Sequence, residues 1–121
     1  VDLKQELISH LKYLPNEHTQ VAAHEPKQVL DWVKNAIQEA DDDQMPKLMQ
    51  DLTGAENVRL IKPFYVTLAK FNSTDVVFNS HTCAFSLDVN VDTFRHLVKA
   101  NNFAYFRDDL LIGASKVLNG V

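Results

Sequence analysis

Apolar and polar residues follow two different periods along this chain, and the period changes near Asn57. Before that point, apolar residues recur every three or four positions, which is the spacing of one face of an α-helix. Within residues 58–90 apolar and polar residues nearly alternate, which is typical of strands with one buried face. Helical spacing returns after Asn90. We therefore predict an α+β domain in which N-terminal helices pack on a small antiparallel sheet of three or four strands, followed by C-terminal helices.

Three helices are predicted in the first half of the chain. The first runs from Asp2 to Leu14, because the Asp2 carboxylate can cap backbone N–H groups and Pro15 follows. The second begins near Pro26, which suits a first helical turn. The third ends at Gly54, a natural helix stop, and Asp43 lies where an acid stabilises the beginning of that helix.

Three strands are predicted next, at residues 58–70, 76–78 and 82–89. Pro63 cannot donate a ladder hydrogen bond, so the first strand should lie at an edge or be bulged. The other edge could pair two subunits in a homodimer, and the oligomeric state is left open. A helix should begin at Asn90 or Asp92.

Two segments of the C-terminal region can each be interpreted in two ways. The aromatic residues within 103–106 could form a short fourth strand. Residues 110–118 are predicted as helix, although Gly113 weakens that assignment and leaves a strand as the alternative.

One hydrophobic core should unite the helices and the sheet, since the apolar positions of each element fall on one face. The residues predicted to be buried in it are Leu7, Val33, Ile37, Leu52, Val66, Phe85, Leu87, Phe94 and Leu97.

Length and composition fit a single domain over residues 1–121, with 45% hydrophobic residues to form its core. No apolar stretch approaches the roughly 20 residues of a membrane helix, and no segment has the pattern of a signal peptide. The chain begins at Val1 instead of methionine, so we expect that residues were removed ahead of it. The only cysteine, Cys83, excludes an internal disulfide, which favours the cytoplasm.

The net charge of −4 is unevenly distributed. Residues 1–57 carry eleven carboxylates and five lysines, whereas residues 58–121 carry seven basic and five acidic groups. The order of helices and strands permits a winged-helix-like DNA-binding protein, whose third helix would enter the major groove. That helix follows three successive aspartates and offers only Lys47 to a phosphate, so the charge pattern disfavours nucleic acid as a partner.

No cluster of residues has the spacing of a catalytic or metal site. His81 and Cys83 could share a strand face, but zinc needs three or four ligands. Residues 41–46 lack the alternating ligands and the glycine of a calcium loop. Cys83 should be buried and inert among its apolar neighbours on the third strand. We therefore expect no cofactor and no metal, and we favour a protein that is not an enzyme.

The acidic helical half favours a small acidic protein-interaction module, such as an adaptor, an inhibitor or an immunity-type protein, acting through its surface. Acidic surfaces steer association with basic partner proteins. Trp32 could serve as an exposed aromatic anchor or, as an alternative, lie at the edge of the core. The candidate binding residues are Asp31, Trp32, Glu39, Asp41, Asp42 and Asp43.

The main alternative is an enzyme or small-ligand-binding domain with a cleft between the sheet and the helices. The polar residues that could line such a cleft are Tyr65, His81, Asp88 and His96. A deep pocket into which two of them converge would favour this alternative.

Overall fold

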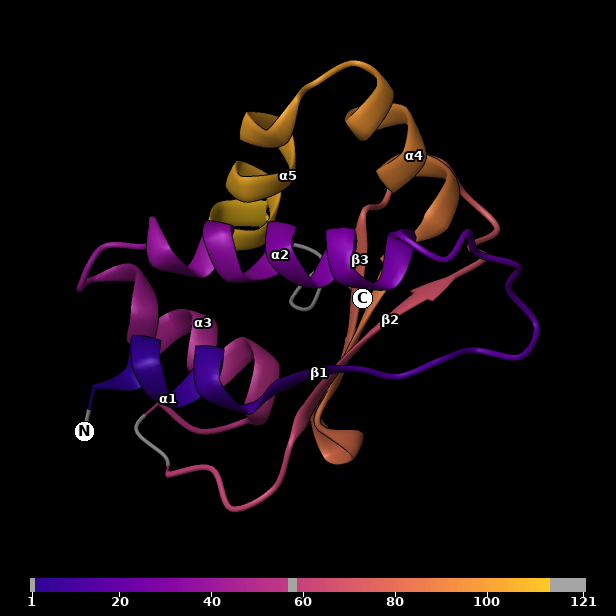
Figure 1. The fold of residues 1–121 in the computed structure, drawn as a ribbon. Coiled ribbons are helices and arrows are strands. Elements are labelled where there is room, and N and C mark those ends of the chain that lie inside the picture. Colours follow the sequence, from indigo (N-terminus) through magenta and orange to yellow (C-terminus); the bar gives the residue numbers. More distant parts are fainter. Residues whose placement is uncertain (1, 57–58, 114–121) are drawn as a thin grey trace.

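The order of helices and strands confirms the predicted α+β class (Figure 1). The structure, a computed structural model, describes residues 2–56 and 59–113. Its helices are α1 (Leu3–His10), α2 (Glu25–Gln38), α3 (Gln44–Thr53), α4 (Val91–Lys99) and α5 (Phe103–Asp108). Its strands are β1 (Leu11–Tyr13), β2 (Phe64–Ala69), β3 (Phe78–His81) and β4 (Ser86–Asn90). A 3-10 turn, η1 (Thr82–Ala84), precedes β4, and a π-helical turn, η2 (Asp109–Gly113), follows α5.

The strands of the described residues form one mixed sheet in the order β1-β2-β4-β3. β2 pairs in parallel with both β1 and β4, and only β3 and β4 are antiparallel. The four strands fall within the predicted three or four, but the sheet is mixed, so the prediction of an antiparallel sheet is wrong. Parallel neighbours need a long crossover connection, and α2 with α3 provides it between β1 and β2.

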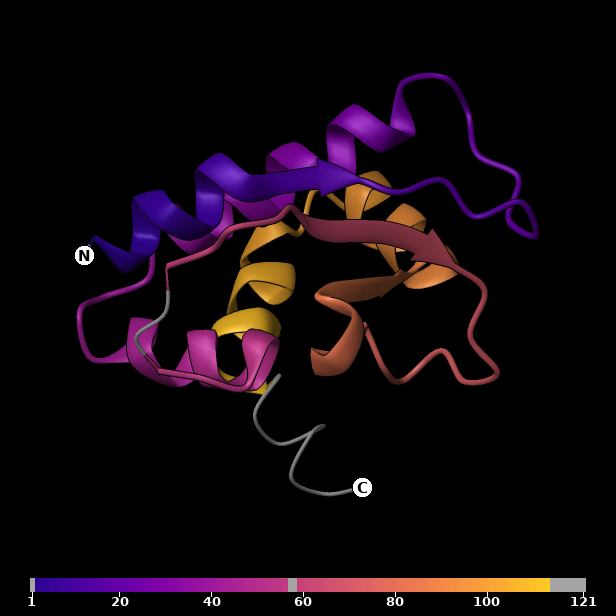
Figure 2. The same ribbon diagram turned by 90° about the horizontal axis from the view of Figure 1, so that it is seen from below.

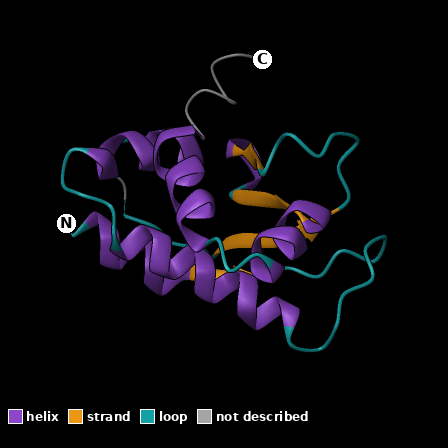
Figure 3. Cartoon of the chain, turned by 90° about the horizontal axis from the view of Figure 1, so that it is seen from above, coloured by secondary structure: helices purple, strands orange, loops and turns teal. Residues whose placement is uncertain are grey.

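One face of the sheet is apolar and carries the helices. Its buried side chains from the two central strands are Phe64, Val66, Leu68, Leu87 and Val89. Figure 3 shows α2 and α4 over this face, whereas Figure 2 looks onto the opposite face. On that outer face the register aligns Thr67 with Asp88 and Asp88 with Asn79, so polar side chains gather there.

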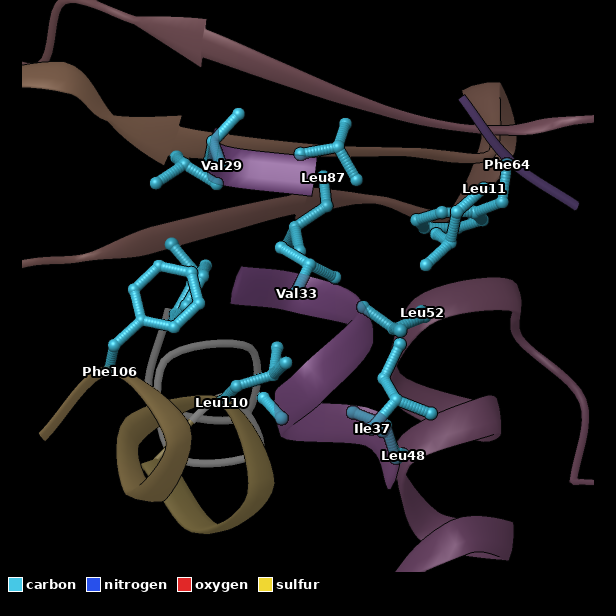
Figure 4. Close-up of a cluster of buried hydrophobic side chains, with 14 of the residues drawn as sticks. Leu11, Val29, Val33, Ile37, Leu48, Leu52, Phe64, Leu87, Phe106 and Leu110 are labelled. Carbon is cyan, nitrogen blue, oxygen red and sulfur yellow. The ribbon is translucent and has the colours of Figure 1, made fainter. Parts of the chain in front are cut away.

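The core lies between this apolar face and the helices, and Figure 4 shows side chains of α2, α3, α5 and the sheet meeting in it. Eight of the nine predicted core residues are buried, and Phe85 alone is half-buried. Phe85 follows η1 with a positive φ of 51°, outside β4. Its ring lies at the edge of the core, where Lys62 Nζ is 4.6 Å from its centroid.

The predicted third strand is wrong in its first half, because Thr82–Ala84 form η1 and the strand begins only at Ser86. Cys83 is consequently exposed, not buried as predicted. The second strand also lies later than predicted, at Phe78–His81.

The first helix ends four residues earlier than predicted. Its beginning is as expected, since Asp2 Oδ1 accepts a hydrogen bond of 3.2 Å from the backbone N–H of Gln5. Its end is not, since Leu11–Tyr13 leave the helix and pair with β2 as an edge strand. Leu11 is buried in either conformation, so the spacing of leucines alone could not distinguish them.

Pro63 lies just before β2, and β2 is a central strand. The predicted edge position or bulge is therefore wrong, because the strand begins after the proline and requires no ladder hydrogen bond from it. Gly54 ends α3 as predicted, with a left-handed φ of 86°.

The aromatic residues after α4 form helix α5 and not a fourth strand, and Asn102 caps this helix through its side chain. Residues 110–113 continue as the turn η2, whereas the rest of the segment predicted at 110–118 lies outside the described residues. None of the helices in the described ranges is both long enough and apolar enough to span a membrane.

Candidate functional site

The turn between α2 and α3 presents three successive carboxylates, Asp41, Asp42 and Asp43, which we call the acidic turn. All three residues are exposed. Within the described part of the chain, Asp42 and Asp43 form no ion pair. Two like charges in adjacent positions therefore face solvent without a compensating cation.

Asp41 has a structural role at the beginning of α3. The backbone N–H of Gln44 donates to Asp41 Oδ1 at 2.7 Å, and the backbone N–H of Asp41 donates to Gln44 Oε1 at 3.0 Å. This reciprocal pair is the geometry of a capping box. Asp43, which we predicted as the stabilising acid, makes no side-chain capping bond.

The other carboxylates predicted for this surface are neutralised by neighbours. Asp31 Oδ2 lies 2.7 Å from Lys27 Nζ, one helical turn away. Glu39 Oε1 lies 2.8 Å from Arg107 Nη1 of α5. The pKa of Arg107 is raised, first by its hydrogen bond with Asp108 and then by that with Glu39. Among the candidate carboxylates, those without an ion pair in the described residues are thus Asp41, Asp42 and Asp43, and Asp41 also caps α3.

Trp32 lies at the core edge, which was the alternative to an exposed anchor. Its ring makes edge-to-face contacts with Phe94, Phe103 and Phe106, at centroid distances of 5.2 to 5.3 Å. The residue is half-buried, and these contacts direct it toward α4 and α5.

A hollow of 430 Å³ lies beside the acidic turn. Asp2, Lys4 and Asp42 line it, so the beginnings of α1 and of the acidic turn face the same space. Lys4 Nζ donates to Gln38 O at 2.9 Å and to Ala40 O at 2.7 Å, which satisfies carbonyl groups at the end of α2. The sequence predicts Asp2 only as a helix cap. Nothing in it indicates that Asp2 lies near the acidic turn.

Three of the four residues of the alternative cleft share the outer face of the sheet, and His96 lies apart from them. His81 Nε2 lies 2.9 Å from Asp88 Oδ2 on the outer face of the sheet, and the register places Tyr65 on that same face. His96 lines a separate cavity of 360 Å³ with Asp92. The sheet residues and His96 therefore belong to different sites.

Asp88 instead lines a cavity of 390 Å³ where β2 ends, which we call the strand-end cavity. Its polar lining residues are Lys70, Asn72 and Ser73 after β2, Asn79 on β3 and Asp88 on β4. Phe71 and Val76 contribute apolar surface. The sequence offered no signal for this group, because its members are up to eighteen positions apart and residues 79–81 were predicted to lie between two strands.

A further charged cluster joins the N-terminus of α2 to α4. Glu25 is buried, and its two oxygens lie 2.9 Å from Nη2 and Nε of Arg95. Arg95 Nη2 also donates to Gln20 O at 2.7 Å, and the backbone N–H of Ala22 donates to Glu25 Oε1 at 2.8 Å. The hydrogen bonds from Arg95 lower the pKa of Glu25 more than burial raises it. These hydrogen bonds fix the loop before α2 to α4.

The described ranges contain no group of three or more histidine, cysteine or carboxylate side chains that could hold a metal ion. Cys83 is exposed beside His81 in sequence, but His81 is bonded to Asp88. No nucleophile with a positioned base emerges from these contacts.

No protein-family model and no curated protein matches the sequence.

Proposed function

We propose that this protein is a protein-interaction module, such as an adaptor, an inhibitor or an immunity-type protein, whose acidic turn binds a basic surface of a partner protein. The observation that carries the proposal is the pair of exposed carboxylates at Asp42 and Asp43, which have no ion-pair partner in the described part of the chain. A partner can pair with them without breaking an internal ion pair. Asp31 and Glu39, which are already paired, contribute less.

The electrostatic reach of these charges suits steering of a partner. At physiological salt the field of exposed charges extends about 8 Å before screening reduces it strongly. Complementary charges at this range raise association rates more than they lower dissociation rates. The acidic turn should therefore act mainly on the rate of encounter.

The hollow beside the acidic turn supports an arginine as the partner's anchoring side chain. Asp2 and Asp42 both line this hollow, and a planar guanidinium can bond two carboxylates at once. Lys4 is occupied by the carbonyls of Gln38 and Ala40, which holds its ammonium group toward the end of α2. An arginine entering the hollow would place a second positive charge beside Asp2 and Asp42.

A nucleic-acid partner is disfavoured by the same residues. The helix that would enter a groove, α3, is introduced by the acidic turn, and each carboxylate there opposes a phosphate. We further propose that the protein acts in the cytoplasm, since its single cysteine forms no internal disulfide.

The test is a pull-down from the source cell with mass spectrometry, using three versions of the protein. One is the wild type and the second is the double variant Asp42→Asn, Asp43→Asn. The third is a matched control, Glu17→Gln with Asp75→Asn, which removes two exposed charges elsewhere. We expect a basic protein to be captured by the wild type and the control but lost with the double variant. Equal capture by all three versions, or capture of nucleic acid alone, would contradict the proposal.

A further inference from the structure

The strand-end cavity lies at a position where sheet geometry favours ligand binding. β2 and β4 are adjacent parallel strands, and Ala69 and Asn90 are paired at their carboxyl ends. In sheets with parallel strands, ligands bind outside these ends, where the connections leave the sheet. The cavity of 390 Å³ is at the small end of the range for ligand pockets, about 300 to 1,000 Å³.

The wall of the cavity is preformed by a buried asparagine. Asn90 is 1% exposed, and its Nδ2 donates to Ser73 O and to Val76 O, each at 2.8 Å. Its backbone N–H donates to Val77 O at 2.8 Å, and Thr93 Oγ1 donates to Thr74 O at 3.1 Å. The loop at residues 70–77 is thereby fixed to β4 and α4, so a ligand would not have to order it.

Two oppositely charged residues line the cavity, Lys70 and Asp88, and each already has one internal partner. Lys70 Nζ lies 2.6 Å from Asp92 Oδ2, and an ammonium group has three donors, so further donors remain for a ligand. Asp88 uses Oδ2 to bind His81, which leaves Oδ1 as an acceptor. Its side chain is 24% exposed, so an ion pair with it would be screened less than one at the open surface. The Asn79 amide adds a donor and an acceptor.

These charges restrict the chemistry of a ligand. A simple anion would be repelled by the Asp88 carboxylate, and a simple cation would be repelled by the Lys70 ammonium group. A small molecule with both an ammonium and a carboxylate group can pair with both. Phe71 and Val76, both half-buried, offer apolar surface for a short hydrocarbon side chain. We propose that the strand-end cavity binds a small zwitterion of the α-amino-acid class with an apolar side chain.

The experiment titrates isotope-labelled wild-type protein with free L-leucine, L-methionine, L-valine and L-phenylalanine and follows backbone amide resonances. Concentrations up to about 10 mM detect dissociation constants in the millimolar range. The expected result is shifts confined to residues 69–79 and 86–90 with at least one of the four. The N-acetyl and the amide derivatives of that amino acid should bind at least about tenfold more weakly, because each lacks one charge.

Two variants locate the site. Asp88→Asn and Lys70→Gln should each weaken binding about tenfold or more, whereas the controls Glu17→Gln and Lys99→Gln, both at exposed positions, should not. If one of the cavity variants fails to fold, the other variant still tests the site. Binding of the blocked derivatives (the N-acetyl and the amide forms) to the wild type tests it as well. Absence of shifts with all four amino acids, equal binding of the blocked derivatives, or binding unchanged by the variants would overturn the proposal.

Discussion

Glu25 connects three segments through one carboxylate. It lies at the beginning of α2, pairs with Arg95 of α4, and accepts a hydrogen bond from Ala22 in the preceding loop. Its side chain is only 8% exposed, whereas that of Arg95 is 44% exposed. Removing the Glu25 charge would therefore leave a guanidinium group that water can still reach, which limits the loss in free energy of unfolding.

We predict that Glu25→Gln lowers the free energy of unfolding by about 1–3 kcal/mol near neutral pH. The pKa of Glu25 is lowered in the folded protein, so its contribution is complete above the ordinary glutamate pKa. It is lost as pH falls through the folded pKa. The difference between wild type and variant, measured by urea unfolding, should therefore shrink from about pH 7 to about pH 3. A difference that is constant over this range would contradict the argument, and Glu17→Gln on the exposed loop is the control.

Cys83 is exposed on η1, which reverses the expectation of an inert thiol. A thiol reagent should label the folded protein at a rate within roughly tenfold of that in denaturant, since access no longer limits the reaction. Cys83→Ser should abolish labelling. Strong protection of the thiol in the folded state would show that η1 is closed in solution.

At the level of elements, the beginning of α3 separates two effects of an acidic residue. Asp41 makes two capping hydrogen bonds with Gln44, whereas Asp43 makes no capping bond. Both lie near the same helix N-terminus, so both interact with its dipole. The difference between the stability lost on substituting Asp41 and that lost on substituting Asp43 therefore measures the effect of the capping hydrogen bonds.

We predict that Asp41→Ala destabilises the protein by about 0.5–2 kcal/mol, as loss of an N-terminal cap does. Asp43→Ala should cost under about 0.5 kcal/mol, because it removes only an exposed charge. Chemical denaturation of both variants provides the measurement. Equal losses would mean that the dipole, and not the capping bonds, determines the effect.

The helices and strands that the sequence predicted well are those whose apolar pattern fits only one kind of secondary structure. α2 and α3 have long apolar faces with Pro26 and Gly54 near their ends, and both lie where expected. Leu11 is buried as the end of a helix or as an edge strand, so local spacing could not reveal β1. With β1 hidden, the parallel pairing that it makes with β2 was hidden as well.

The candidate sites were less predictable, because pairing between side chains is a tertiary property. Nothing in the sequence indicated that Arg107 of α5 would neutralise Glu39, or that Asp2 would line the same hollow as Asp42. The alternation of β4 correctly placed Asp88 on a polar face. Its role in a cavity depends on Lys70 and Asn79, which only the strand order brings together.

For the whole molecule, Phe106 is the residue that joins the helices to the sheet. It is 0% exposed and lies among the buried side chains of Figure 4. Its ring contacts Phe78 of β3, Phe94 of α4 and Trp32 of α2. We predict that Phe106→Ala lowers the free energy of unfolding by about 3–5 kcal/mol through loss of contacts and a residual cavity. Tyr105→Ala, one position away and 51% exposed, should change it by less than about 0.5 kcal/mol. Similar losses in thermal or denaturant unfolding would contradict this description of the core.

The charge of the whole molecule is divided between an acidic first half and a weakly basic second half. This division gives the electrostatic field of the surface a direction. The acidic turn contributes carboxylates that have no ion pair in the described part of the chain. A basic partner should therefore approach along that side.

The most direct test of this proposal is the association rate constant of the captured partner, measured by surface plasmon resonance over a range of salt concentrations. For the wild type it should fall steeply with salt and should exceed that of Asp42→Asn, Asp43→Asn several-fold at low salt. The two rates should converge near 1 M salt, where screening acts within about 3 Å, and the dissociation rates should remain similar throughout. An association rate at low salt that is the same for the wild type and the double variant would show that the acidic turn does not guide the partner.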